Sequence, residues 1–373
     1  MIWIFWAAVG LVCYTYIGYF VWLCVRRYSH PQAVQSAEYL PSISIVLIVH
    51  NEARTLGRKL RSLLKIEYPD HKKEIIVVSD GSTDDTNRIL SEFASTSRVT
   101  VILRQENQGK AAGLNDAINA SRGEIVVFTD ARQEVEANAV ANLVENFVDP
   151  CIGCVSGELY LGDPLAGEST RRMGTYWQLE KLIRKMEGAS GSVIGASGAL
   201  YAVRRRLLVP VPPETILDDV FIPMEVVRQG ARVTIDSRAR VWDVPDLGTH
   251  REFARKVRTL SGLYQLLRLQ PWLLSSSNPV RFEFISHKLL RLAIPFALCA
   301  ALISSCFLPA LIYRIAFFAQ VAFYSLSMCG SLLKRWDRLA KVADVAFIFV
   351  LLNAAAFVAF GNFVVGRKPA WAT

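Results

Sequence analysis

The stretch IIVVSDGSTDDT, residues 75–86, decides how this chain folds, because a buried strand in it runs directly into a polar turn. The apolar run at 74–78 is typical of a strand covered on both faces, and Asp80-Gly81-Ser82 is typical of a tight turn. Thr83 is expected to cap a helix that continues through Leu90. The stretch therefore predicts a strand, a turn and a helix, with an acidic residue at the carboxyl end of the strand.

The same alternation of strand and helix patterns continues on both sides of this stretch. Upstream it predicts a strand at 43–49 and a helix over 52–64. Downstream it predicts strands at 99–103 and 124–128 and helices over 109–120 and 135–147. This order indicates an α/β domain with a mainly parallel sheet and helices on both faces. No G-x-G-x-x-G follows the first strand and no G-x-x-x-x-G-K-[ST] occurs, so hydride transfer and P-loop chemistry lose their main support.

Polar groups follow three of these strands: His50-Asn51-Glu52, Asp80-Gly81-Ser82 and Asp130-Ala131-Arg132. One acidic residue after a strand is ordinary helix capping, and that interpretation stays open for each of them. Three such ends in one sheet indicate more, because parallel α/β sheets bind ligands outside the carboxyl ends of their strands. The pattern predicts a binding site at this edge.

The residues at this edge have the chemistry that a nucleotide sugar requires. Glu52 and Asp80 can accept hydrogen bonds from ribose hydroxyls or a base N–H, and Lys110 can reach the nucleotide or remain a solvated surface lysine. Asp130 can ligate a divalent cation, Mg²⁺ or Mn²⁺, that stabilises a departing diphosphate. Arg258 can add bidentate positive charge to the diphosphate or, since it lies in a basic stretch, contact lipid.

Two adjacent carboxylates, Asp218 and Asp219, begin an apolar and partly helical stretch. Asp218 can be a helix cap, and two neighbouring carboxylates in an apolar setting can raise one another's pKa. Sugar transfer to a hydroxyl needs a base, because the alcohol loses a proton as it attacks. We assign the base to Asp219.

The chain has 373 residues and is 52% apolar, with the excess at its two ends. Residues 2–25 are almost continuously apolar and, at ~1.5 Å per residue, can cross a ~30 Å bilayer core. A signal peptide would need basic residues before the run, whereas Arg26 and Arg27 follow it. Three further candidate spans, with buried core helices as the alternative, are separated by Arg314 and the basic run 334–338. They are residues 292–313, 315–333 and 344–366.

The net charge is +9, and much of the basic excess flanks the α/β region. The flanking residues are Arg26, Arg27, Arg281, Lys288 and Arg291. The positive-inside rule then places residues 26–291 in the cytoplasm. Four full spans would put Arg367 and Lys368 outside, so a re-entrant or interfacial third segment stays open. Anionic lipid and diphosphate account for the basic balance, and we expect no nucleic-acid partner.

Seven stretches, in order over roughly residues 42–270, resemble those of family 2 inverting glycosyltransferases with a GT-A fold. They are IVHNEA (48–53), IIVVSDGSTDDT (75–86), NQGKAAGLNDA (107–117), GEIVVFTDA (123–131), GASGALYAVRR (195–205), ILDDVFIP (216–223) and RKVRTLSG (255–262). The likeness is greatest to membrane synthases of cellulose, chitin, hyaluronan and poly-N-acetylglucosamine. The first four stretches together are highly specific.

The resemblance implies roles on the donor side of the site. Glu52 and Asp80 are similar to the acids that contact uridine, and Lys110 is similar to the lysine that contacts the nucleotide. Asp130 resembles the first aspartate of the metal-binding D-x-D, and Arg258 resembles the arginine of Q-x-x-R-W.

The family resemblance also implies roles on the acceptor side of the site. Asp219 resembles the final aspartate of the T-E-D motif, which is the catalytic base. The loop with Gly195, Ser197 and Gly198 resembles the loop beside the acceptor end, and Asp218 precedes the base.

Three departures from the family pattern qualify these roles. The D-x-D position has Arg132 as its third residue, so metal binding is expected to be weaker or to depend more on the diphosphate. The T-E-D position is Leu217-Asp218-Asp219, which keeps the essential acid. Thr259 replaces the tryptophan of Q-x-x-R-W that would stack beneath an acceptor sugar, so addition of one or a few sugars competes with processive polymerisation.

Taken together, the sequence predicts a transmembrane anchor at 1–27, a GT-A catalytic domain at 42–245, interfacial helices with an R-x-x-R-T motif at 246–288, and a transmembrane region at 289–373 with two to three spans. The expected activity moves a sugar, with inversion, from a UDP-sugar to a glycan or polyprenyl-linked acceptor during cell-surface or extracellular polysaccharide synthesis. The expected location is the inner membrane, with the catalytic domain in the cytoplasm and with the bilayer and export-complex subunits as partners. A non-catalytic subunit that binds nucleotide or glycan is the alternative, and a membrane-anchored oxidoreductase lacks its dinucleotide fingerprint.

Overall fold

The computed structural model of the chain describes residues 1–94, 98–162, 175–243, 249–329 and 337–367. It divides into two compact units. One, the helical unit, comprises residues 1–24, 246–268 and 281–373, and the other, the sheet unit, comprises residues 25–245 and 269–280.

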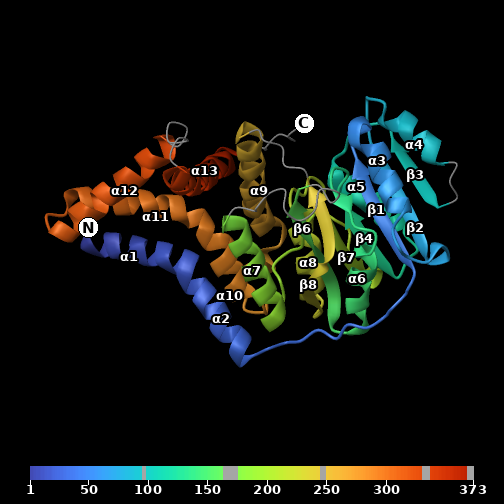
Figure 1. The fold of residues 1–373 in the computed structure, drawn as a ribbon, viewed down its shortest axis with the longest axis horizontal. Helices are drawn as coiled ribbons and strands as arrows, with labels where there is room; N and C mark the ends of the chain where they lie inside the picture. Colours follow the sequence, from blue (N-terminus) through green and yellow to red (C-terminus); the bar gives the residue numbers. More distant parts are fainter. Residues whose placement is uncertain (95–97, 163–174, 244–248, 330–336, 368–373) are drawn as a thin grey trace. The chain divides into compact units, whose positions relative to one another are not determined.

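The sheet unit is built on an eight-stranded sheet in the order β3-β2-β1-β4-β7-β6-β8-β5 (Figure 1). The strands are β1 (Ile43–Val49), β2 (Lys73–Asp80), β3 (Val99–Arg104), β4 (Ile125–Thr129), β5 (Glu134–Val135), β6 (Ile152–Leu161), β7 (Leu200–Arg204) and β8 (Arg232–Asp243). β1 pairs in parallel with β2 and β4, and β2 pairs in parallel with β3, which confirms the predicted mainly parallel sheet.

Strand direction brings distant parts of the chain to one edge of the sheet. β7 runs antiparallel to both β4 and β6, and β6 runs parallel to β8. The strands β1, β2, β3, β4, β6 and β8 therefore all point the same way. Their carboxyl ends share one edge, called the carboxyl edge below, and this is where an α/β sheet binds ligands.

Helices cover both faces of the sheet. They are α3 (Ala53–Leu64), α4 (Thr86–Ala94), α5 (Lys110–Ala120), α6 (Ala139–Glu145), α7 (Thr175–Ser190) and α8 (Asp218–Arg228). On one face, α3 and α6 bury apolar side chains in a core shared with Ile45 and Val77. On the other face, α5 packs so closely that a Cβ on Gly113 would lie 2.9 Å from Ile48. Fully burying one Leu or Ile side chain stabilises the fold by ~2 kcal/mol.

Two predicted helices begin later than the sequence pattern indicated. The helix expected from Thr83 begins at Thr86, because the Thr83 N–H donates to the Asn51 side chain at 2.8 Å and the Asp84 carboxylate accepts the Ala53 N–H at 3.1 Å. The helix expected from Val135 begins at Ala139, because Glu134 and Val135 pair with Trp242 and Val241 of β8. In both cases a contact with a neighbouring segment outweighs local periodicity.

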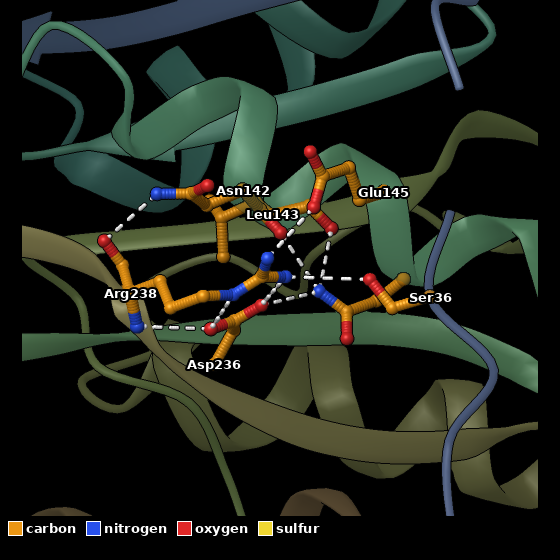
Figure 2. A network of polar contacts seen from close by, with 7 residues as sticks. Ser36, Asn142, Leu143, Glu145, Asp236 and Arg238 are labelled. Carbon is orange, nitrogen blue, oxygen red and sulfur yellow. Dashed lines mark hydrogen bonds and ion pairs between the residues drawn. The ribbon is translucent and has the colours of Figure 1, made fainter. Parts of the chain in front are cut away.

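A polar network ties β8 to α6 and to the segment before β1 (Figure 2). The Arg238 guanidinium donates to Asp236 at 2.8 Å, to Ser36 at 3.3 Å and to Glu145 at 2.9 Å. Asn146 also donates to Asp236, at 2.8 Å. Burial raises the pKa of Asp236, but these hydrogen bonds outweigh burial and hold it below its ordinary value. The network is structural, since the Arg238 guanidinium bonds three different residues.

The helical unit contains α1 (Ile2–Cys13), a π-helical turn (Tyr14–Gly18), most of α2 (Tyr19–Ser29), α9 (Thr249–Leu269), α10 (Arg281–Glu283), a second π-helical turn (Phe284–Leu289), α11 (Leu290–Phe307), α12 (Leu311–Cys329) and α13 (Asp337–Val365). Among the described residues, four helical segments are long and apolar enough to cross a membrane: Ile2–Ser29, Arg281–Phe307, Leu311–Met328 and Val342–Val365. Inside the unit, Phe5 packs with Ala297, Ala301 and Tyr313, while many large apolar side chains face outward.

The break between the second and third segments differs from the expected position. The sequence placed it at Arg314, but α11 ends at Phe307 and Arg314 lies within α12. Pro309 lies between the two helices; it has no N–H to donate and restricts the residue before it, so the helix ends there. Most of the basic run at 334–338 lies outside the described residues.

Candidate active site

Three charged side chains from separate elements meet at the carboxyl edge. Lys110 begins α5, Asp130 follows β4, and Asp218 begins α8. The Lys110 ammonium lies 3.0 Å from the Asp130 carboxylate and 3.1 Å from the Asp218 carboxylate. Burial lowers the pKa of Lys110, but Asp130, Asp218 and Asp219 outweigh it, and the pKa ends above its ordinary value. Lys110 is therefore a permanent cation among carboxylates.

The Asp219 and Asp130 carboxylates both lie close to Gly198, which has no side chain. The Ala196 N–H donates to the Asp219 carbonyl at 2.6 Å. A Cβ on Gly198 would lie 3.4 Å from one Asp219 carboxylate oxygen and 3.5 Å from one Asp130 carboxylate oxygen. Asp218 is buried and Asp219 is only half-buried, so Asp219 is the more accessible carboxylate to a substrate.

The loop with Gly195, Ser197 and Gly198 is held in place by backbone geometry and hydrogen bonds. Gly195 has φ +88, a conformation that suits glycine. The Ser197 N–H donates to the Ser156 hydroxyl at 2.9 Å. The structure thus brings the residues expected on the acceptor side next to Asp218 and Asp219.

Asp80 anchors the loop that carries Lys110. Its buried carboxylate accepts the Gln108 N–H at 3.1 Å and the Gly109 N–H at 2.8 Å. Gly81 makes room for this loop, because a Cβ there would lie 2.3 Å from the Asn107 nitrogen. The expected contact of Asp80 with a nucleotide stays a prediction, and the structure adds a positioning task that sequence reasoning missed.

Glu52 lies at the start of α3, and its carboxylate accepts the Thr55 hydroxyl at 2.7 Å. The preceding Asn51 has φ +55, which asparagine tolerates better than most residues, and its side chain accepts the Thr83 N–H at 2.8 Å. These contacts join the ends of β1 and β2. Arg258 lies on α9 in the helical unit, and its role stays a prediction.

Lys59 is a buried cation that the sequence analysis did not single out. It donates to the Thr129 hydroxyl and to the Gln133 carbonyl, each at 2.8 Å, and so braces the turn that carries Asp130. Burial lowers the pKa of Lys59 to about 7, against the opposing charges of Asp130 and Glu134. On α3 it occupies a position where helical periodicity predicts core, and this conflict is the signal that could have revealed it.

Arg132 turns its guanidinium to a buried carboxylate. Its Nε donates to Asp243 at 3.1 Å and its Nη2 donates to the other Asp243 oxygen at 2.7 Å. Gln133 adds a further hydrogen bond to Asp243 at 3.2 Å. Asp243 ends β8, so this pair also lies at the carboxyl edge.

The donor set offers a divalent cation limited support from the protein. The described residues contain no group of three or more His, Cys, Asp or Glu side chains that could hold a metal. Asp130 provides a carboxylate oxygen, which suits one ligand of a cation that takes its other ligands from phosphate and water. The site fits a metal that arrives with its substrate better than a resident one.

Residues 44–209 match the model of the family described as glycosyl transferase family 2. The chain carries a glycosyl transferase family 2 domain. Poly-beta-1,6-N-acetyl-D-glucosamine synthase of Staphylococcus aureus is 25% identical over 236 residues, or 62% of this chain and 57% of that relative. The Staphylococcus epidermidis synthase is 25% identical over 239 residues, or 63% of this chain and 58% of that relative. The match spans little more than half the length of these relatives.

Among solved structures, the chain is similar to a mannosyltransferase, PcManGT, from Pyrobaculum calidifontis in complex with GDP-Man and Mn²⁺. The two chains are 22% identical, with a TM-score of 0.73 over 96% of this chain and 98% of that one. At this identity the likeness shows the fold, and it confirms the predicted GT-A class.

Proposed function

We propose that this chain is a membrane-bound, inverting glycosyltransferase that moves a sugar from a UDP-sugar to a glycan or lipid-linked glycan acceptor. One observation carries the proposal most directly: Asp130, Asp218 and Asp219 meet around Lys110 and Gly198 at the carboxyl edge. The mutual repulsion of the carboxylates that follow β4 and begin α8 is offset there by Lys110, whose side chain is 23% exposed.

The reaction that this geometry supports is a single displacement. The acceptor hydroxyl oxygen forms a bond to the anomeric carbon as the bond from that carbon to the diphosphate oxygen breaks. The hydroxyl proton passes to the Asp219 carboxylate, and the nucleoside diphosphate leaves with the electron pair of the broken bond. Attack opposite the leaving group inverts the anomeric centre. Gly198 has no side chain, and a Cβ there would contact the carboxylates of both Asp219 and Asp130.

On the donor side, Glu52 and Asp80 are proposed to contact the nucleoside, and Lys110 and Asp130 to lie toward the diphosphate, with Arg258 as a further cationic contact. A divalent cation, Mg²⁺ or Mn²⁺, held by Asp130 would neutralise charge on the leaving group. The bound GDP-Man and Mn²⁺ of the Pyrobaculum mannosyltransferase support a nucleotide-sugar donor and a cation. The choice of UDP rests on the family resemblance.

The apolar segments support a multi-pass location in the inner membrane, with residues 42–245 as a cytoplasmic catalytic domain. In this arrangement, residues 1–27 are an anchor, 246–288 form interfacial helices, and 289–373 form the C-terminal membrane region. The polysaccharide synthases among the relatives support a glycan or polyprenyl-linked acceptor in surface polysaccharide synthesis, with export-complex subunits as further partners.

The test uses the full chain in detergent with a panel of UDP- and GDP-sugars and Mg²⁺ or Mn²⁺. We expect nucleoside diphosphate release that falls ~10²- to 10⁴-fold in Asp219→Asn, because the base is lost. Asp85→Asn, in an exposed pair with Arg88 just before α4, is the matched control and should keep full activity. Nucleotide binding without turnover by the unaltered chain would instead support a non-catalytic subunit.

A further inference from the structure

The strongest unassigned feature of the glycosyl transferase domain is the pair formed by Arg132 and Asp243. Asp130 and Arg132 both follow β4, and Asp243 ends β8, so the pair lies at the same edge as the carboxylates described above. The family pattern would place a second acidic residue at position 132. In this chain position 132 is an arginine, and its guanidinium pairs with the buried Asp243 carboxylate.

The guanidinium is fixed from several directions. Asp243 is 4% exposed and accepts two hydrogen bonds from Arg132, while Gln133 bonds the same carboxylate. Lys59 in turn donates a hydrogen bond to the Gln133 carbonyl. Bidentate pairing of this kind sets the plane of the guanidinium as well as its position. An arginine ordered in advance loses less rotamer freedom when it binds a ligand.

Arg132 also keeps the capacity to bind a ligand. Its side chain is 46% exposed, and Nε and one Nη2 hydrogen suffice for the two bonds to Asp243. The remaining guanidinium N–H groups have no partner among the residues that the structure describes. Planar, bidentate donors match the oxygens of a phosphate group better than the point charge of a lysine does.

Resting on the proposed function, we propose that Arg132, oriented by Asp243, binds the diphosphate of the nucleotide donor directly. It supplies by hydrogen bonds part of what a second carboxylate would supply through a bound cation. Arg132 is then a donor-binding residue and Asp243 its positioning residue. The consequence is that a nucleoside diphosphate binds this chain measurably even when no divalent cation is present.

The experiment measures binding of UDP, GDP and uridine to the full chain in detergent by calorimetry, once with EDTA and once with Mg²⁺. We expect UDP or GDP to bind in EDTA, and Arg132→Ala to weaken that binding at least 10-fold. Uridine has no phosphate, so its affinity should not change in Arg132→Ala. Arg206→Ala, an exposed arginine just after β7, is the matched control and should bind like the unaltered chain.

Two further variants separate binding from folding. Arg132→Lys keeps the charge but loses the bidentate fork, so an intermediate loss in EDTA is expected. Arg132→Asp should bind diphosphate poorly in EDTA and regain affinity with Mg²⁺, because it restores a second carboxylate. Unchanged thermal unfolding of any one variant without nucleotide shows that its loss is one of binding.

The proposal is overturned if Arg132→Ala binds UDP or GDP in EDTA as tightly as the unaltered chain does. It is also overturned if the unaltered chain binds them only with Mg²⁺; the proposed function would survive either result. No binding of any nucleotide in either condition would remove the proposed function itself.

Discussion

Two buried aspartates on β8 each hold an arginine, and the two pairs differ in what remains unbonded. Arg238 bonds Asp236, Glu145 and Ser36, and Asn146 adds to the same carboxylate. Arg132 bonds only Asp243 among the described residues. Their side chains are almost equally exposed, 53% and 46%, so exposure does not separate them. The number of partners does separate them. The Arg238 guanidinium bonds three residues and acts as a structural clamp. The Arg132 guanidinium bonds one residue and leaves N–H groups for a ligand.

The same contrast separates the carboxyl edge from the rest of the sheet unit. At that edge, Lys110 lies between the carboxylates that follow β4 and begin α8, and Asp219 adds a third negative charge. Around Asp236, the Arg238 guanidinium bonds both nearby carboxylates, those of Asp236 and Glu145 (Figure 2). Variants at the carboxyl edge should therefore affect chemistry, whereas variants in the Asp236 network should affect folding.

Among the variants that test this contrast, Asp130→Asn has the largest expected effect. Loss of this carboxylate should lower sugar transfer ~10²- to 10³-fold, the usual range for one electrostatic group that stabilises a transition state. The thermal unfolding temperature should hardly change, because Lys110 keeps Asp218 as a partner. A loss of stability that matches the loss of activity would erase the contrast between the two regions.

Lys59, which braces the turn that carries Asp130, provides a second test of this contrast. Its folded pKa of about 7 lies below the ordinary lysine value, so between pH 7 and the unfolded pKa the unfolded chain binds a proton that the folded chain lacks. Stability should therefore rise with pH across this window, by about 3 kcal/mol between pH 7 and 9.5. Thermal unfolding from pH 7 to 9.5 should show the rise in the unaltered chain and lose it in Lys59→Met. An equal rise in both would contradict the assignment.

Asp236→Ala is expected to act on stability alone. Removing the carboxylate leaves Arg238 and Asn146 without a main partner, at a cost of about 2 kcal/mol. The unfolding temperature should fall by several degrees while the affinity for UDP or GDP stays constant. Asp85→Ala, in an exposed pair with Arg88 just before α4, is the control and should leave the unfolding temperature unchanged. A weakened nucleotide affinity in Asp236→Ala would show that the network is more than a clamp.

The smallest expected effect is a change in the unfolding temperature at acidic pH. Because the folded pKa of Asp236 is held below its ordinary value, its stabilising contribution is present above the unfolded pKa and is lost as pH falls through the folded pKa. The unfolding temperature of the unaltered chain should therefore drop more steeply below pH 4 than that of Asp236→Ala. Parallel curves for the two chains would argue against the lowered pKa.

The fold was largely predictable because strands and helices here are marked by local patterns. The apolar runs that became β1, β2 and β4 needed no information from elsewhere in the chain. Where prediction was wrong, a distant partner decided the outcome, as when β5 formed against β8 and displaced the start of α6. The helix break at Pro309 had a local signal that the more conspicuous Arg314 concealed.

The candidate site was predictable in its members but less so in its connections. Residue type and position at the end of a strand indicated Asp80 and Asp130 as site residues. Spacing along the chain did not reveal that the Asp80 carboxylate bonds the loop before Lys110. The partner of Arg132 lies on β8, more than a hundred residues away in the chain. Such pairs depend on strand order, which no local pattern encodes.

The position of Asp243 at the end of a regularly paired stretch of β8 has a consequence for how relatives of this chain can diverge. Successive residues of a strand point to opposite faces, so one inserted or deleted residue between Arg240 and Asp243 would turn Asp243 away from Arg132. Substitutions along this stretch can be absorbed one at a time. A change in its length cannot, and alignments of related chains should therefore be free of gaps here even where the residues themselves vary.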